Sequence, residues 1–184
     1  IPVVLYGCRS FDDALIELKL IMENAGFGVI AAGAFVGEHS FPQTWGAGRP
    51  NDSDLADMEK FVEAIAKKLT MGGAGAAPTV SGNNPPTEYY TPRDRYGKGI
   101  DIRKVKPKTN DKCTMCGLCA SLCPLGSISF EDFKTINGIC MKCCACIKRC
   151  PVGAKYFDDE GYLYHKSELE AIYGDRVAEN QLFY

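Results

Sequence analysis

Cysteine is the residue type in this chain whose spacing points most directly to chemistry. Eight of the ten cysteines fall into two runs of one pattern, C-x2-C-x2-C-x3-C-P. The first run is Cys113, Cys116, Cys119 and Cys123, followed by Pro124, and the second is Cys140, Cys143, Cys146 and Cys150, followed by Pro151. Thiolates are ligands for soft metal ions and for iron–sulfur clusters, and such clusters accept and donate single electrons. Eight thiolates are enough for two sites with four ligands each.

Two other uses of cysteine fit this spacing less well. Zinc sites usually consist of two separated Cys-x2-Cys pairs, whereas here each run places four cysteines within eleven residues. A disulfide framework would require an oxidising compartment, and no signal-peptide pattern begins at Ile1. The cysteines therefore favour clusters and a reducing compartment, and we expect a cytoplasmic location.

The pattern resembles the motif of bacterial-type ferredoxins, which hold two [4Fe–4S] clusters in a small α+β domain. A shift of 27 positions carries the first run onto the second, so residues 111–157 are expected to form two similar halves. In that family the fourth cysteine of each run ligates the other cluster. The resemblance implies one ligand set made of Cys113, Cys116, Cys119 and Cys150, and a second made of Cys140, Cys143, Cys146 and Cys123.

One pair of equivalent positions differs within the repeat. Gly117 leaves room for the backbone to approach the first cluster closely, because glycine has no side chain. Its equivalent in the second half is Cys144, an additional thiol. We interpret Cys144 as a small, partly buried filler, with a redox role or ligand exchange as the alternatives.

Residues 1–70 have the pattern of a β-α-β-α segment. Residues 2–6 and 27–35 are short apolar runs, as expected for buried parallel strands. Ser10 is expected to cap a helix that ends at Gly26, and residues 50–53 supply the start of a second helix. Two parallel strands do not make a stable sheet alone. This incomplete parallel sheet therefore requires strands from upstream residues or from a second chain.

The same segment resembles the last two strand–helix units of a flavodoxin. The resemblance rests on PVVLYG at residues 2–7, FDDA at 11–14 and AGAFVGEHSF at 32–41. Together with the cysteine runs, it makes the chain similar to flavodoxin–ferredoxin fusion proteins. The resemblance implies that Tyr6, Gly7 and Phe11 belong to a loop that contacts the FMN ring. The Ser/Thr-rich phosphate loop of flavodoxins does not occur here, so FMN would be held mainly by residues upstream of this chain.

Side chains near this loop also have simpler interpretations. Phe11 fits core packing against the start of the helix equally well. His39 is interpreted as a structural or surface residue, and Trp45 as an anchor for its loop, with covering of a flavin as the alternative. Cys8 is a candidate for thiol chemistry outside the cluster motif.

The remaining segments are expected to connect and to dock. Residues 71–110 are interpreted as a linker rich in glycine and proline, with a basic stretch over residues 93–112. That stretch is either a solvated face or a docking strip for an acidic partner or flavin phosphates. Residues 158–184 are expected to hold a short helix, capped by Ser167 and ended by Gly174, and an apolar docking tail. The net charge of −2 gives no indication of nucleic-acid binding, and no apolar run is long enough to span a membrane.

These patterns predict an electron carrier rather than an enzyme. Two [4Fe–4S] clusters would exchange single electrons with FMN, which takes up two electrons and releases them singly. The alternative is a flavin-dependent reductase module in which the clusters feed a substrate site, although no pair of acid–base groups marks such a site. Purely structural clusters are a third interpretation. The sequence does not identify the redox partner protein.

Overall fold

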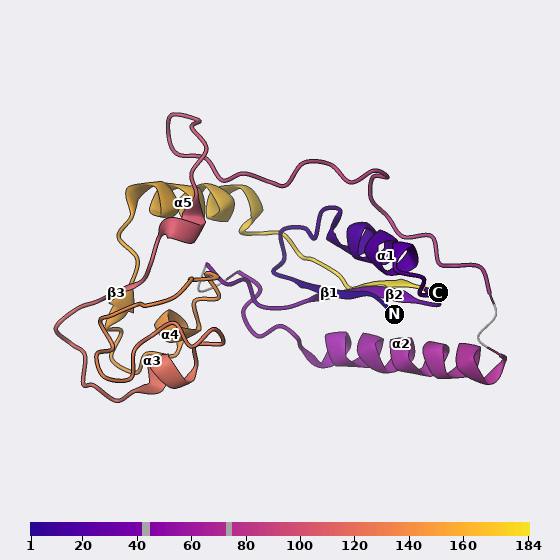
Figure 1. Ribbon diagram of the computed structural model, residues 1–184, viewed down its shortest axis with the longest axis horizontal. Coiled ribbons are helices and arrows are strands. Elements are labelled where there is room, and N and C mark those ends of the chain that lie inside the picture. The colour runs from indigo at the N-terminus through magenta and orange to yellow at the C-terminus, as the bar shows by residue number, and fades with distance from the viewer. Residues whose placement is uncertain (42–44, 73–74) are drawn as a thin grey trace. The chain divides into compact units, whose positions relative to one another are not determined.

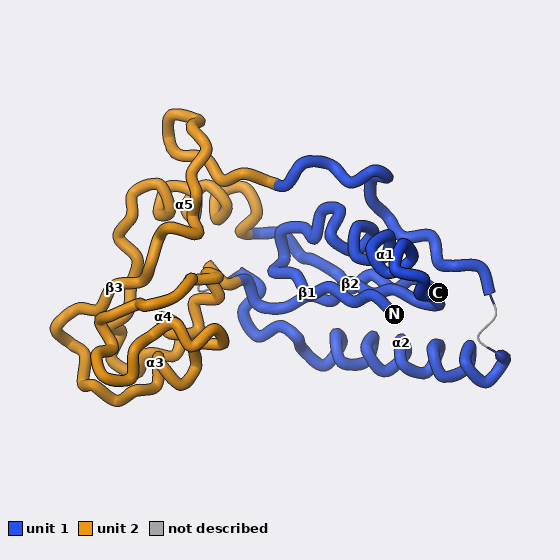
Figure 2. Tube along the Cα trace, viewed as in Figure 1, with its two compact units in different colours: residues 1–39, 44–89, 175–184 blue, residues 40–43, 90–174 orange. Residues whose placement is uncertain are grey.

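The computed structural model describes residues 1–41, 45–72 and 75–184 of the chain. Its contacts divide into two units, which Figure 2 colours separately. Unit 1 comprises residues 1–39, 44–89 and 175–184, and unit 2 comprises residues 40–43 and 90–174. The segment expected to be a linker, residues 71–110, thus contributes to both units, and its residues 73–74 lie outside the described residues. The domain boundaries predicted from the sequence stay predictions.

Unit 1 is built on a three-stranded sheet in the order β1-β2-β5. Strand β1 (Val3–Tyr6) runs parallel to β2 (Ala32–Val36), with Val4 opposite Ala34. Strand β5 (Gln181–Phe183) pairs with β2 in the antiparallel direction, so the sheet is mixed rather than purely parallel. The apolar tail therefore docks as a strand. The second strand begins at Ala32 instead of residue 27, since Phe27 is exposed and only Ala32–Val36 is buried throughout.

Two helices cover opposite faces of this sheet, as Figure 1 shows. Helix α1 (Ala14–Asn24) packs Leu15 and Ile16 against the small side chains of Ala32 and Ala34. Helix α2 (Asp52–Thr70) packs Phe61 on the other face, and its ring meets that of Phe35 edge to face with centroids 5.5 Å apart. Small residues on one face of β2 and a large one on the other let both helices pack closely.

The starts of the two helices differ in how well the sequence predicts them. Asn51 caps α2 and forms a reciprocal capping box with Asp54, as the helix-start residues predicted. Helix α1 begins after Asp13, so the prediction that Ser10 caps it was wrong. The Ser10 hydroxyl instead accepts a hydrogen bond from the Asp12 N–H within the preceding turn. The Asp13 carboxylate accepts hydrogen bonds from Asn83 and Thr87, which ties residues 83–87 to unit 1.

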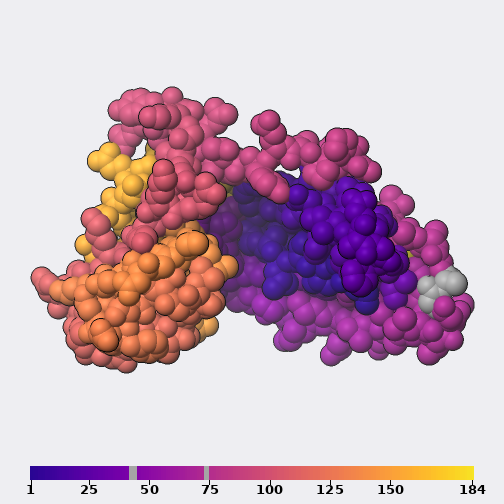
Figure 3. Space-filling model, viewed as in Figure 1, coloured from indigo at the N-terminus to yellow at the C-terminus, as the bar shows by residue number. Residues whose placement is uncertain are grey.

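Unit 2 consists of short elements around the cysteines. They are η1 (Ile102–Lys104), β3 (Lys108–Thr109), α3 (Leu118–Ser121), α4 (Ala145–Lys148), β4 (Lys155–Tyr156) and α5 (Glu160–Tyr173). Strands β3 and β4 pair antiparallel, and α3 packs against α4. In the space-filling view, the residues of the two runs, coloured salmon to orange, pack together (Figure 3).

Helix α5 starts earlier than the sequence predicted. Asp159 is its cap and accepts a hydrogen bond from the Tyr162 N–H, so Ser167 lies inside the helix rather than at its start. The earlier start lets α5 bury Tyr162 and Leu169 on unit 2. Across the described residues of both units, no helix is both long enough and apolar enough to cross a bilayer.

Candidate metal centre

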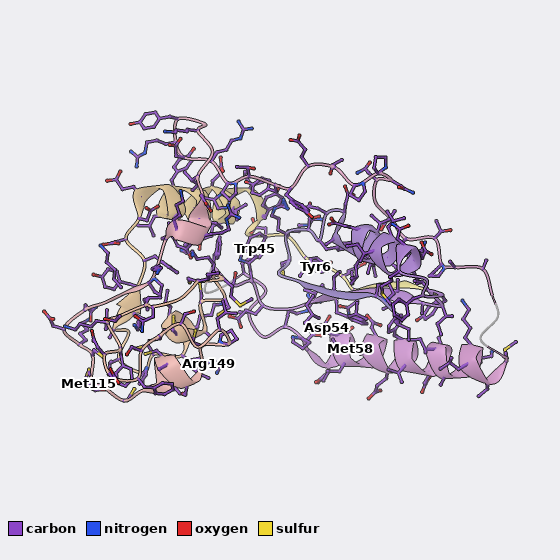
Figure 4. All side chains as sticks on the ribbon, viewed as in Figure 1. Tyr6, Trp45, Asp54, Met58, Met115 and Arg149 are labelled. Atoms are coloured by element: carbon purple, nitrogen blue, oxygen red, sulfur yellow. The ribbon has the colours of Figure 1, made fainter. Side chains whose placement is uncertain are left out.

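The two cysteine-rich halves of unit 2 repeat their backbone conformation as well as their sequence. Three pairs of residues related by the 27-residue shift have positive φ: Met115 (58°) with Lys142 (60°), Gly117 (78°) with Cys144 (57°), and Gly126 with Gly153 (both 59°). Left-handed backbone is uncommon for residues other than glycine. Its presence at Met115, Lys142 and Cys144 therefore indicates that both loops need the same turn. Figure 4 labels Met115 in the first of these loops.

Each half surrounds a cavity lined by four cysteines of one predicted set. The first cavity is lined by Cys113, Cys116, Cys119 and Cys150, together with Phe133 and Lys155. The second cavity is lined by Cys140, Cys143, Cys146 and Cys123, together with the additional cysteine, Cys144, and apolar residues such as Ile128, Ile139 and Phe157. In each cavity three cysteines come from one run and the fourth comes from the other. The structure thus brings together the same groups that the resemblance to ferredoxins implies.

The donor set suits a cluster better than a single ion. Among the described residues, no three Cys, His, Asp or Glu side chains converge on a point where one ion could be held. The four cysteines instead lie around the wall of each cavity. A [4Fe–4S] cluster takes one thiolate at each of four iron corners, so ligands spread around a cavity fit it.

The fourth cysteine of each run lies within a turn of backbone donors. The Ser127 N–H donates to Cys123 Sγ at 3.3 Å, and the equivalent Ala154 N–H donates to Cys150 Sγ at 3.2 Å. Burial alone would raise the pKa of Cys123, but hydrogen bonds from the backbone, led by Ser127, lower it below the ordinary value. The same balance lowers the pKa of Cys150, led by the Ala154 N–H. Both turns therefore favour the thiolate, which is the form that binds metal.

The third cysteine of each run lies deeper and behaves differently. Burial raises the pKa of the Cys119 thiol, and it raises that of Cys146 to about 12. The charge of Lys155 acts in the opposite direction on both thiols. Without metal these two side chains therefore carry protons at neutral pH, and metal loading must displace them.

The additional thiol, Cys144, is buried and lines the second cavity. Its Sγ lies 3.5 Å from the Lys142 carbonyl oxygen and 3.7 Å from the Tyr162 hydroxyl. Tyr162 is itself buried, and its ring packs on Phe157 with centroids 4.3 Å apart. These contacts agree with the interpretation of Cys144 as a buried filler.

The residues predicted to contact an FMN ring are engaged within unit 1. Tyr6 and Phe11 meet edge to face with centroids 5.2 Å apart, and the Tyr6 hydroxyl donates to the Glu179 carbonyl oxygen at 2.6 Å. Phe11 also packs against the core cluster that includes Leu15. A Cβ at Gly7 would lie 2.8 Å from His39 Cα, so glycine is required there. Their role in FMN binding stays a prediction.

Two further residues of this region, Trp45 and Cys8, are buried and contact other residues of unit 1. Trp45 is buried and stacks on the His39 ring with centroids 4.4 Å apart, as expected of a loop anchor. Cys8 is buried, and its thiol lies 3.9 Å from the Gly37 carbonyl oxygen. Burial raises the pKa of Cys8, which makes its thiol less reactive. Figure 4 labels Tyr6 and Trp45, and it also labels two residues of α2, Asp54 and Met58.

Comparison with known proteins agrees with the geometry of the first cysteine run. Residues 107–129 match the family model of 4Fe-4S binding domains. This match supports a ferredoxin-like iron–sulfur domain that binds a [4Fe–4S] cluster and serves in electron transport. The matched segment contains all four cysteines of the first run. Neither the curated proteins nor the solved structures gave a match to the chain.

The sequence interpretation missed one residue of the centre, Lys155. Its side chain is only 3% exposed and lines the first cavity. A usable signal was present, because the 27-residue shift carries Ile128 onto Lys155. An apolar residue in one half and a lysine in the other mark a position where the repeat is broken inside the core.

Proposed function

We propose that the chain is a one-electron carrier with two [4Fe–4S] clusters, one in each cavity of unit 2. Cys113, Cys116, Cys119 and Cys150 would hold the first cluster, and Cys140, Cys143, Cys146 and Cys123 the second. The observation that carries the proposal is that the fourth cysteine of each run lines the cavity of the other. Clusters so held would supply reversible one-electron chemistry at low potential.

The protein would contribute dry cavities, thiolate-stabilising donors and exposed points of electron entry. Backbone N–H groups near Cys123 and Cys150 offset the negative charge of the ligated clusters. Cys116 and Cys143 are exposed, and they occupy equivalent places in the two runs. An electron would therefore enter or leave through these ligands. All ten cysteines are free, which supports a reducing compartment such as the cytoplasm.

The proposed exchange partner is FMN in a flavodoxin-like domain that unit 1 completes only in part. Strand β1 pairs on one side with β2, and its Leu5 side chain is 77% exposed. Helices cover both faces of the sheet, as parallel sheets in α/β proteins require. Further strands, from residues upstream of Ile1 or from a second chain, would pair with the outer edge of β1. That added part would hold most of the FMN, with Tyr6, Gly7 and Phe11 at its ring.

Anaerobic purification tests the cluster proposal directly. Iron and acid-labile sulfide should each reach about eight per chain, since each [4Fe–4S] cluster holds four of each. Electron paramagnetic resonance (EPR) after chemical reduction should show two interacting [4Fe–4S] clusters. Stoichiometric zinc with little iron, or iron that reduction does not change, would overturn the proposal.

The flavin part of the proposal needs its own measurement. Flavin should be absent from the isolated 184-residue chain and present when upstream or partner segments are co-expressed with it. With flavin bound, reduced clusters should convert it to its one-electron reduced form in stopped-flow spectra. Turnover of an organic acceptor by the purified complex would instead favour the reductase module.

A further inference from the structure

Lys155 carries a buried charge that no carboxylate of the described residues contacts directly. Strand β4 places it opposite Thr109, and its ammonium group donates a hydrogen bond to the Phe133 carbonyl oxygen. Within the described part of the chain, no Asp or Glu forms an ion pair with it. A buried charge is costly unless an opposite charge or a set of hydrogen bonds compensates it. The Lys155 charge also acts on the Asp132 carboxylate, but no ion pair joins these two side chains. A single neutral acceptor and this indirect attraction compensate the buried ammonium group only in part.

The wall of the first cavity is where a compensating anion would lie. Lys155 lines this cavity beside Cys113, Cys116, Cys119 and Cys150. A cluster ligated by four thiolates is negative in both of its oxidation states. The bound cluster is therefore the opposite charge that the Lys155 ammonium lacks.

The second cavity has no such charge at the equivalent position. The 27-residue shift places Ile128 where the first cavity has Lys155, and Ile128 lines the second cavity. The two halves match in their N–H···S hydrogen bonds, because Ser127 and Ala154 donate at nearly the same distance. Lys142 is a second buried lysine, but it lines neither cavity, and its ammonium group donates to the carbonyl oxygens of Arg103 and Cys140. Among the residues that line the two cavities, the centres thus differ by one buried positive charge.

We propose that Lys155 is the counter-charge of the first cluster and raises its reduction potential above that of the second. The inference rests on the proposed function, since it requires a cluster in each cavity. Reduction adds one electron, and hence one negative charge, to a cluster, and a nearby ammonium stabilises that charge. An electron delivered by a one-electron donor protein would thus reside on the first cluster, while the second cluster stays oxidised until more electrons arrive.

The expected size of the effect follows from Coulomb's law. A unit charge acting over about 10 Å through protein of effective dielectric constant about 20 changes an equilibrium roughly tenfold. At a potential that half-reduces the first cluster, Lys155→Met should lower its reduced-to-oxidised ratio about tenfold. The second cluster should change less, because Lys155 does not line its cavity, although its charge also acts on Cys146.

Three variants separate charge from shape. Lys155→Met removes the charge with a side chain of similar length, and Lys155→Arg keeps the charge. Lys134→Met is the matched control, because Lys134 is an exposed lysine of the same unit. We expect Lys155→Arg and Lys134→Met to resemble the parent protein in both cluster ratios.

The measurement is an anaerobic redox titration of the holoprotein followed by EPR. Two backgrounds assign the signals: Cys140→Ala/Cys143→Ala leaves the first cluster, and Cys113→Ala/Cys116→Ala leaves the second. Lys155→Met should shift the first background strongly and the second weakly. Equal shifts in both backgrounds, or an equal shift from Lys134→Met, would overturn the inference.

Loss of cluster is also informative. If Lys155→Met loses the first cluster and Lys155→Arg retains it, the ammonium is required as counter-charge and the inference stands. If both variants lose it, shape rather than charge is decisive and the inference is wrong. Iron content separates this failure from failure of the proposed function. A parent chain without about eight iron refutes both proposals, whereas a chain with eight iron and insensitive potentials refutes the role of Lys155 alone.

Discussion

The exchange of fourth cysteines between the two runs can be tested by pairing cysteine variants. The structure groups Cys150 with Cys113 around the first cavity, although Cys150 belongs to the same run as Cys140. Cys113→Ala/Cys150→Ala would then remove two ligands from one cluster. Cys140→Ala/Cys150→Ala would remove one ligand from each cluster. Alanine is preferred to serine because it provides no oxygen ligand.

The ligand count gives the magnitude. In Cys113→Ala/Cys150→Ala the second cavity keeps its four cysteines, so about four iron and one intact [4Fe–4S] cluster should remain. In Cys140→Ala/Cys150→Ala neither ligand set keeps its four cysteines, so no intact [4Fe–4S] cluster should remain, unless Cys144, which also lines the second cavity, replaces Cys140 as a ligand. Clusters that have lost one iron atom would not be mistaken for intact ones, because the EPR signals of three-iron and four-iron clusters differ.

The assay is iron and sulfide analysis combined with EPR of the dithionite-reduced protein. The matched control is Cys8→Ala/Cys144→Ala, which removes the two cysteines outside both ligand sets and should keep about eight iron, although Cys144 lines the second cavity. If the Cys113→Ala/Cys150→Ala protein has no intact cluster while Cys140→Ala/Cys150→Ala keeps one, each run holds its own cluster. That result would refute the grouping of cysteines inferred from the cavities.

Three further predictions concern the two units separately. Asp54→Ala should destabilise unit 1 by about 3–5 kcal/mol, because it breaks a buried ion pair between Arg49 and Asp54. The Asp54 side chain is only 3% exposed. Urea unfolding followed by fluorescence of the single tryptophan, Trp45, measures this loss, and exposed Asp52→Ala is the control. The hydrogen bond from Arg49 lowers the pKa of Asp54 although burial opposes it, so this stabilisation is present above about pH 4 and lost as the pH falls. The stability difference between parent and Asp54→Ala should therefore shrink below about pH 4, and a constant difference would contradict the assignment. Removal of iron by a chelator should abolish amide-exchange protection in unit 2 and leave the Trp45 unfolding midpoint unchanged, whereas preserved protection would show that unit 2 folds without metal.

The two similar cysteine loops were predictable because their information is local and repeated, whereas the exchange of the fourth cysteines was implied by the resemblance to ferredoxins. The spacing within each run and the 27-residue shift determine which loops resemble each other, and the structure brings the implied groups together around two cavities. The start of α2 was predictable for a similar reason. Asn51 and Asp54 form a capping box within a few residues, without help from distant parts of the chain.

Features that depend on distant partners were not predictable in the same way. Ser10 and Ser167 have the side chain of a helix cap, but Asp13 and Asp159 take the cap positions because packing sets where α1 and α5 begin. The pairing of β5 with β2 joins segments far apart in sequence, and no local pattern specifies its antiparallel direction. The role of Tyr6, Gly7 and Phe11 at an FMN ring remains a prediction, because their contacts in unit 1 are those of ordinary core residues.

Duplication and difference have separate roles in unit 2. The repeated backbone gives two cavities of the same construction, and two equal centres would share one electron without preference. A carrier that moves electrons in one direction needs two centres of different reduction potential. The smallest change that produces such a difference keeps the ligand loops as they are. A change at one buried position, from Ile128 in the first half to Lys155 in the second, meets this condition because both residues lie in the core and neither is a ligand. Under this proposal the burial of the Lys155 ammonium group has a functional reason, since the cluster that compensates its charge would also be the centre whose potential it raises.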